Sequence, residues 1–134
     1  MMLVDYGLEF NYRDISNVYA PYVPVTLIGP QDAVDVLALV DSSARGCLIQ
    51  GEYAAQIGLN LLQGSLETFH GLGGGTVQAY LHNIRIECNG STFQIEAGFS
   101  NGPIRFNVLG GTFLSHVQLG LREHWGKIYI NPTP

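Results

Sequence analysis

The sequence predicts a small all-β domain, a closed barrel or a sandwich, with one or two short helices. Short apolar runs rich in Val, Ile, Tyr and Phe recur along the 134 residues, and 17 glycines and frequent turn signals separate them. No long stretch has the apolar spacing of a helix. Because no linker, repeat or low-complexity segment divides the chain, we expect a single domain over residues 1–134.

In the first half of the chain, residues 1–24 are expected to be irregular. Short apolar runs bounded by turn residues then predict strands over residues 25–28, 34–40 and 47–49. The second of these runs is apolar enough for a strand that is buried on both faces. Residues 52–57 are expected to form one or two turns of helix, which Gly58 ends.

The clearest local prediction is a β-hairpin around Asn89-Gly90. Asn-Gly is a strong signal for a two-residue hairpin loop, and it places Cys88 opposite Ser91. The same register makes apolar residues face one another across the two strands, in the pairs Ile86–Phe93 and Ile84–Ile95.

Upstream of this hairpin the apolar alternation shifts by one residue, from positions 77, 79 and 81 to positions 84, 86 and 88. We interpret the shift as a bulge or bend near His82-Asn83. The last part of the chain is expected to hold a short helix-like piece and a final hairpin, over residues 112–116 and over residues 117–119 with 127–130.

The charge pattern argues against nucleic-acid and membrane partners. The net charge is −5 and the six Lys and Arg residues are scattered, so no basic patch exists to meet phosphates or an anionic membrane. No apolar run is long enough for a membrane span, and the N-terminus has no signal-peptide pattern. We expect a cytoplasmic protein in which Cys47 and Cys88 are reduced, buried thiols. Their spacing does not suit a metal, and neither a metal nor a cofactor is expected.

The glycine-rich stretch over residues 71–76 does not fit a nucleotide site. A P-loop needs a Gly-Lys-Ser/Thr sequence that opens a helix, and this stretch has no lysine. A dinucleotide-binding turn also needs a following helix, whereas the residues from Val77 onward alternate as a strand. The stretch is therefore either an ordinary surface loop or a mobile cover over a cleft.

Asp41 is a candidate for chemistry because it directly follows a buried apolar strand. A charge in that place is costly unless another group hydrogen-bonds it or shares its proton. One interpretation is an Asx-type turn, in which Ser42 and Ser43 cap the side chain. The other is a carboxylate that shares a proton with a second acid.

Residues 20–130 resemble the retropepsin-like aspartic proteases, in the bacterial single-domain branch related to the retroviral proteases. The resemblance lies in the order and spacing of short motifs: Val25-Thr26-Leu27-Ile28, ALVDSSARGCLI at residues 38–49, Ile57-Gly58-Leu59, residues 71–80 in the place of the flap, and Val108-Leu109-Gly110 followed by Phe113-Leu114.

The resemblance implies a closed β-barrel that works as a symmetric homodimer, because each chain supplies one aspartate. Two Asp41 side chains would meet on the two-fold axis, share one proton and activate water for hydrolysis of a peptide bond. The substrate would be a peptide or protein with bulky apolar residues around the scissile bond, cut best at acid pH. No cofactor or metal would take part.

The resemblance also implies roles for the residues around Asp41. Ser42 would hydrogen-bond across the dimer axis, and Ser43 would lie against the paired carboxylates as part of the catalytic turn. Residues that bind substrate would come from this turn, from the flap tip and from the loop that supports the aspartate: Ala44, Leu72, Gly73, Gly74, Gly75, Val108 and Leu109. Glycines at a flap tip let the backbone approach a peptide closely.

Two departures from the family pattern lie beside Asp41. The family has glycine where this chain has Ser43, whose side chain would either crowd the carboxylates or donate one more hydrogen bond to them. An acid and an arginine that pair in many members are replaced by Arg45 and Gly111. Ser43 keeps a second hypothesis open, a weak or inactive module that dimerises or binds extended peptides. A third hypothesis is an unrelated β-barrel that binds a small ligand at its glycine-rich mouth.

Overall fold

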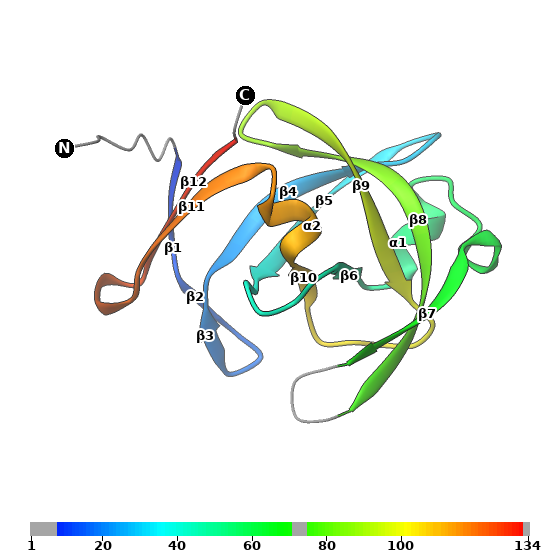
Figure 1. Ribbon diagram of the computed structural model, residues 1–134, viewed down its shortest axis with the longest axis horizontal. Helices are drawn as coiled ribbons and strands as arrows, with labels where there is room; N and C mark the ends of the chain where they lie inside the picture. The colour runs from blue at the N-terminus through cyan, green and yellow to red at the C-terminus, as the bar shows by residue number, and fades with distance from the viewer. Residues whose placement is uncertain (1–7, 71–74, 133–134) are drawn as a thin grey trace.

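The computed structural model describes residues 8–70 and 75–132. These residues form short strands with a few helical turns between them (Figure 1). In chain order the elements are β1 (Leu8–Asn11), β2 (Arg13–Ile15), β3 (Val18–Ala20), β4 (Tyr22–Ile28), β5 (Ala33–Val40), β6 (Cys47–Ile49), α1 (Glu52–Gln56), η1 (Leu61–Gln63), β7 (Ser65–His70), β8 (Thr76–Cys88), β9 (Ser91–Ser100), β10 (Asn107–Leu109), α2 (Gly111–Leu114), β11 (Val117–Arg122), η2 (Glu123–Trp125) and β12 (Lys127–Pro132).

Six strands form a closed barrel in the order β4-β5-β10-β6-β9-β8, and pairing of β4 with β8 closes it. β7 extends the sheet as a further strand beside β8. The core contains fully buried side chains from every one of the barrel strands, among them Val23, Leu27, Ala38, Ile49, Ile86, Phe99 and Leu109. The predicted all-β class is therefore confirmed, and of the two predicted architectures the structure has the closed barrel.

β10 lies between β5 and β6, parallel to β5 and antiparallel to β6. The chain thus leaves β5 at Val40, turns, and returns in β6, while a much later segment fills the gap between these two strands. Because β5 and β10 run in the same direction, both end at the same edge of the sheet. Asp41 follows one strand and Gly110 follows the other.

The hairpin of β8 and β9 has the predicted register, with Cys88 opposite Ser91. The φ angles of Asn89 and Gly90 are 52° and 77°. Two successive positive φ angles define a type I′ turn, whose twist matches that of the flanking strands.

Of the bulge or bend that we expected near His82-Asn83, the bulge is absent. β8 and β9 keep one register without interruption from the pair Ala79–Ser100 to the end of the hairpin. The apolar pattern shifts because β8 changes its second neighbour, which is β7 as far as Leu81 and β4 from Arg85 onward. Beside β7 the strand also buries Ala79, on the face opposite to that of Ile84.

The expectation that residues 1–24 are irregular is wrong for the part that the structure describes. β1 pairs with β12, and β2 and β3 form a small hairpin that turns at Ser16-Asn17. β4 begins at Tyr22 and includes Pro24. Proline is tolerated there because this part of β4 pairs only with β5, whereas β8 pairs with β4 from Thr26 onward.

The first helix and its end agree with the prediction. Gly58 has a φ of 89°. Its N–H donates to the Ala55 carbonyl (3.1 Å), and the Leu59 N–H donates to the Ala54 carbonyl (2.9 Å). This pair of bonds is a Schellman motif, which requires a left-handed residue that glycine provides at little cost.

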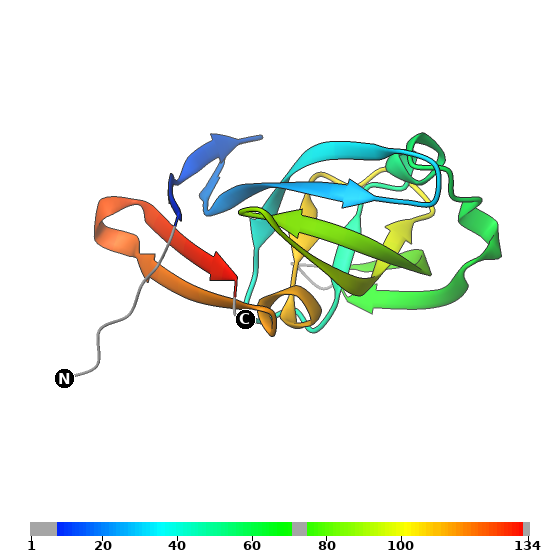
Figure 2. The same ribbon diagram turned by 90° about the horizontal axis from the view of Figure 1, so that it is seen from above.

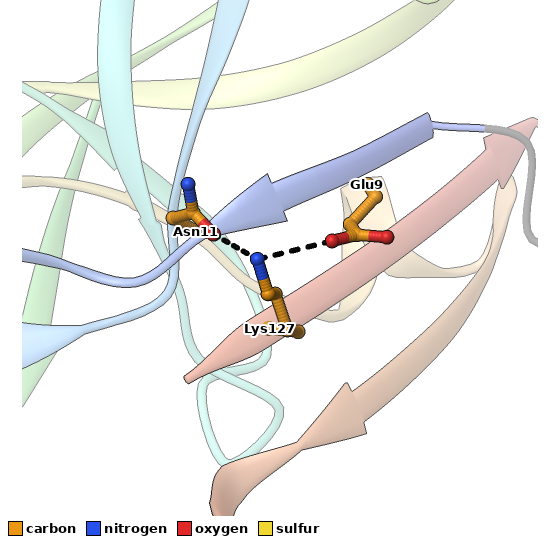
Figure 3. Close-up of polar contacts among 3 residues, drawn as sticks. All are labelled: Glu9, Asn11 and Lys127. Carbon is orange, nitrogen blue, oxygen red and sulfur yellow. Dashed lines mark hydrogen bonds and ion pairs between the residues drawn. The ribbon is translucent and has the colours of Figure 1, made fainter. Parts of the chain in front are cut away.

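β1, β12 and β11 form a separate three-stranded sheet beside the barrel (Figure 2). One face packs on the core through Ile128 and Ile130, which are fully buried. On the other face, the Lys127 ammonium makes an ion pair with Glu9 (3.1 Å) and donates a hydrogen bond to Asn11 (Figure 3). The ends of the described chain are thus joined by backbone pairing and by one lysine.

Candidate active site

The backbone of Asp41 is held where β5 and β10 end side by side. The Asp41 N–H donates to the Leu109 carbonyl (3.0 Å), and the Asp41 carbonyl accepts from the Ala44 N–H (3.2 Å). The first bond extends the β5–β10 pairing by one residue, and the second closes a tight turn. The residue is half-buried, so its carboxylate lies at the boundary between the core and solvent.

Ser43 caps the Asp41 carboxylate within the same chain. Its N–H (3.0 Å) and its hydroxyl (2.5 Å) both donate to Asp41 Oδ1. This is the Asx-type turn of the first interpretation, with Ser43 rather than Ser42 as the capping residue. Among the described residues nothing donates to Asp41 Oδ2. Both serines are exposed.

The turn after Asp41 is packed against the start of α2 through backbone atoms. The carbonyl of Ala44 accepts from the Gly111 N–H (2.8 Å), and the carbonyl of Arg45 accepts from the Thr112 N–H (2.9 Å). A Cβ atom on Gly110 would lie 2.2 Å from the Gly46 carbonyl oxygen. Glycine at position 110 therefore permits the contact that fixes the active-site turn.

The residues expected to bind substrate occupy different depths. Leu109 is fully buried and supports the turn from the core, while Val108 and Ala44 are half-buried. Gly75 is exposed, with open space where a Cβ would stand. Three members of the expected flap tip lie outside the described residues: Leu72, Gly73 and Gly74.

The sequence contains no signal for the contact that joins β7 to the turn after Asp41. Phe69 of β7 packs where two glycines leave room for its ring. A Cβ on Gly98 would lie 2.7 Å from that ring, and a Cβ on Gly46 would lie 3.2 Å from it. β7 is therefore seated on the turn that carries Asp41. No local signal reveals this, because the three residues are far apart in the sequence.

A cavity of about 300 Å³ lies between the start of β8 and the loop that precedes β10. The Asn101 N–H donates to the Gln78 carbonyl (2.8 Å) and ties the two segments together. The lining residues come from these two segments: Thr76, Val77, Gln78, Asn101, Gly102, Pro103 and Ile104. No pattern in the sequence indicates that residues 101–104 form a cavity wall.

The loop before β10, which forms one wall of the cavity, contacts the β2–β3 hairpin. The Arg105 guanidinium donates to the Ser16 carbonyl (2.5 Å) and lies over the Phe106 ring, 5.1 Å from its centroid. The other neighbour of Phe106 is Tyr22, with ring centroids 5.8 Å apart, and the Tyr22 hydroxyl donates to the Val18 carbonyl (3.0 Å). The β2–β3 hairpin thus positions the cavity wall.

The thiols and the other candidate ligands do not form a further site. Both cysteines are buried, and burial raises the pKa of Cys47 and raises that of Cys88 to about 11. Cys47 Sγ lies 3.3 Å from the Thr112 hydroxyl. Within residues 8–70 and 75–132, no group of three or more His, Cys, Asp or Glu is arranged to hold a metal ion. Over the same residues, no helix has the length and apolar character to cross a membrane.

This closed barrel, with β10 inserted between β5 and β6, has the retropepsin-like fold, as its similarity to two proteases of known structure shows. One similar structure is that of a retropepsin-like aspartic protease from Rickettsia conorii. The match covers 92% of this chain and 98% of the protease chain, with a TM-score of 0.63 and 17% sequence identity. Another similar structure is that of EIAV protease in complex with the inhibitor HBY-793. The match covers 72% of this chain and 86% of the protease chain, with a TM-score of 0.55 and 16% sequence identity.

At these identities the likeness establishes the fold, and the fold that the sequence motifs implied is confirmed. No protein-family profile and no curated protein matches this sequence. The activity therefore has to be argued from the site itself.

Proposed function

We propose that this chain is one half of an aspartic endopeptidase, which is completed when two copies pair symmetrically. The observation that carries the proposal is the position of Asp41, at the common end of β5 and β10 in a fold shared with two aspartic proteases. Each chain brings one such aspartate, so a symmetric pair brings two carboxylates to the two-fold axis.

The chemistry follows from two carboxylates at close range. They cannot both be ionised, so they share one proton. The ionised partner takes a proton from a water molecule as the water oxygen bonds to the carbonyl carbon, and the protonated partner donates its proton to the carbonyl oxygen. The C–N bond then breaks, the nitrogen takes a proton from a carboxyl group and leaves as an amine, and the carbonyl re-forms as the second product's carboxyl group. Because Ser43 engages Asp41 Oδ1, the oxygen available to the water or to the twin carboxylate is Oδ2.

An extended peptide is the substrate that suits the rest of the site. Among the described strands β7 pairs only with β8, so its outer edge is available to main-chain hydrogen bonds from a peptide. The cavity beside Gln78, which polar and apolar residues line, takes a side chain of the peptide. The flap-tip role expected for Leu72, Gly73, Gly74 and Gly75 belongs to this proposal, although only Gly75 lies within the described residues. Ser42 hydrogen-bonds to its copy across the axis.

The test is replacement of Asp41 by asparagine in the full chain. Asp41→Asn should reduce cleavage of a peptide with bulky apolar residues at its centre by more than about 10³-fold, since no acid remains to activate water. Sedimentation should show that the dimer persists. Asp35→Asn, an exposed change on the same strand, serves as the matched control and should retain activity. An unchanged rate in Asp41→Asn would show the assignment to be wrong.

A second candidate function is a peptide-binding or dimerising module without catalysis, and the Ser43 cap on Asp41 favours it. Ser43→Gly removes the hydroxyl bond and discriminates between the two. If cleavage appears or rises sharply, the natural protein is a damped enzyme. If a well-folded Ser43→Gly dimer cuts nothing, the binding role is the better account. A strictly monomeric protein in sedimentation would instead favour a barrel that binds a small ligand.

A further inference from the structure

Two arginines flank the candidate active site of an acidic protein. The chain has 11 acidic residues and only six Lys and Arg, yet Arg45 follows the Asp41 turn and Arg105 lies in the loop beside the cavity. Both are exposed. In the described part of the chain no arginine, these two included, forms an ion pair with a carboxylate, whereas Lys127 does so with Glu9. Their positive charge is thus available to a ligand.

The backbone of Arg45 is fixed between the catalytic turn and the flap strand. Its carbonyl accepts from the Thr112 N–H (2.9 Å), and the next residue, Gly46, packs against the Phe69 ring of β7. The neighbour across this contact is Gly111, where an added Cβ would lie 3.0 Å from the Arg45 carbonyl oxygen. That neighbour has no side chain to neutralise the guanidinium.

Arg105 lies in the loop before β10, next to Ile104 of the cavity wall. One of its nitrogens donates to the Ser16 carbonyl, and the guanidinium lies over the Phe106 ring. A guanidinium has five N–H donors, so this arrangement leaves donors available while it limits the motion of the side chain. In a symmetric pair each arginine is present twice, so the pair carries four of these positive charges.

We propose that Arg45, assisted by Arg105, selects peptides in which acidic residues flank an apolar centre. This inference rests on the proposed function and names its substrate class. A guanidinium binds a carboxylate through two parallel hydrogen bonds, and like charges at the edge of a cleft raise the local concentration of the opposite charge. An ion pair at an exposed rim gives a modest preference, about 3- to 10-fold in affinity.

The experiment measures peptide binding rather than cleavage, with the full-length Asp41→Asn protein. Three fluorescent peptides share one apolar centre and carry Glu, Gln or Lys on its flanks, and fluorescence anisotropy gives each affinity. We expect the Glu peptide to bind about 3- to 10-fold more tightly than the Gln peptide, and the Lys peptide to bind most weakly. The preference should shrink at 0.5 M salt, because salt screens exposed charges.

Substitutions test whether Arg45 causes the preference for the Glu peptide. Arg45→Gln should abolish most of it, and Arg45→Lys should keep part of it. Arg85→Gln is the matched control, because Arg85 is also exposed but lies seven residues along β8 from Gln78, roughly 23 Å away. It should leave the preference intact.

Three outcomes count against the inference. Equal affinity for the Glu and Gln peptides overturns it, and so does a preference that survives in Arg45→Gln; both leave the proposed endopeptidase standing. Failure of every peptide to bind overturns this inference and also the proposed function. Loss of cleavage in Asp41→Asn has no bearing here, because the readout is binding.

Discussion

At the scale of the residue, the active-site turn depends on side chains that are absent as much as on those that are present. Ser43 fixes one oxygen of Asp41, while glycines at 46, 98 and 110 let β7 and the start of α2 contact the turn. A fixed carboxylate with one engaged oxygen is the feature on which the proposed chemistry depends.

Gly110→Ala tests this dependence. The new Cβ would lie 2.2 Å from the Gly46 carbonyl oxygen and 2.6 Å from the Ala44 carbonyl oxygen, and rigid backbone cannot yield to it cheaply. We expect the free energy of unfolding to fall by more than about 2 kcal/mol, measured by urea denaturation. Gly102→Ala is the control, since no atom lies within 4 Å of its added Cβ, and it should change stability by less than about 0.5 kcal/mol. Equal effects of the two changes would contradict the proposed role of the contact.

The sequence predicts the part of the site that is local and misses the part that is not. Asp41 and its capping serine lie within three residues, so an apolar strand followed by Asp-Ser-Ser is enough to indicate them. Phe69 and the wall around Phe106 contact the site only after the barrel has closed. No spacing within the sequence reports such contacts, because they join segments far apart in the chain.

At the scale of the element, strands that depend on neighbouring residues were predicted, whereas strands that depend on distant segments were missed. The β8–β9 hairpin follows from a two-residue turn that sets its own register. β1 has too few apolar residues to be recognised alone, and it becomes a strand because it pairs with β12 at the opposite end of the chain. A shift in the apolar–polar alternation of a strand does not by itself predict a bulge. In β8 the shift marks a change of neighbouring strand, from β7 to β4, and not a change of register.

Lys127→Met tests how β1 is held. The ammonium contacts Glu9 and Asn11 on β1 (Figure 3), and methionine keeps an unbranched side chain, one atom shorter, without the charge. We expect a loss of less than about 1 kcal/mol in global stability, because exposed ion pairs contribute little. Hydrogen exchange should nevertheless become faster at β1 amides, since four residue pairs are the remaining attachment of this strand to β12. Arg85→Met should leave exchange at β1 unchanged, and unaltered exchange in Lys127→Met would show that backbone pairing alone suffices.

At the scale of the whole molecule, closure of the barrel decides the environment of both thiols. Pairing of β4 with β8 completes the barrel, and Cys47 and Cys88 are buried in its core. A thiolate inside that core would lose its hydration, and this is why burial raises the pKa of each thiol. The cysteines therefore couple the stability of the whole barrel to alkaline pH.

Whether alkaline pH raises or lowers the stability follows from the pKa of the thiol in the unfolded chain and in the folded protein. In the unfolded chain Cys88 loses its proton near the ordinary pKa of 9.0, whereas in the folded protein it does so only near 11. The stabilisation is complete below pH 9 and is lost as the pH rises toward 11, because the unfolded state releases the proton first. Burial of Cys47 acts in the same direction.

We expect the free energy of unfolding in urea to fall by about 1 kcal/mol or more between pH 9 and pH 10. Cys88→Ala should lower stability at pH 8 but flatten the decline above pH 9, and an equally steep decline in that variant would place the effect elsewhere.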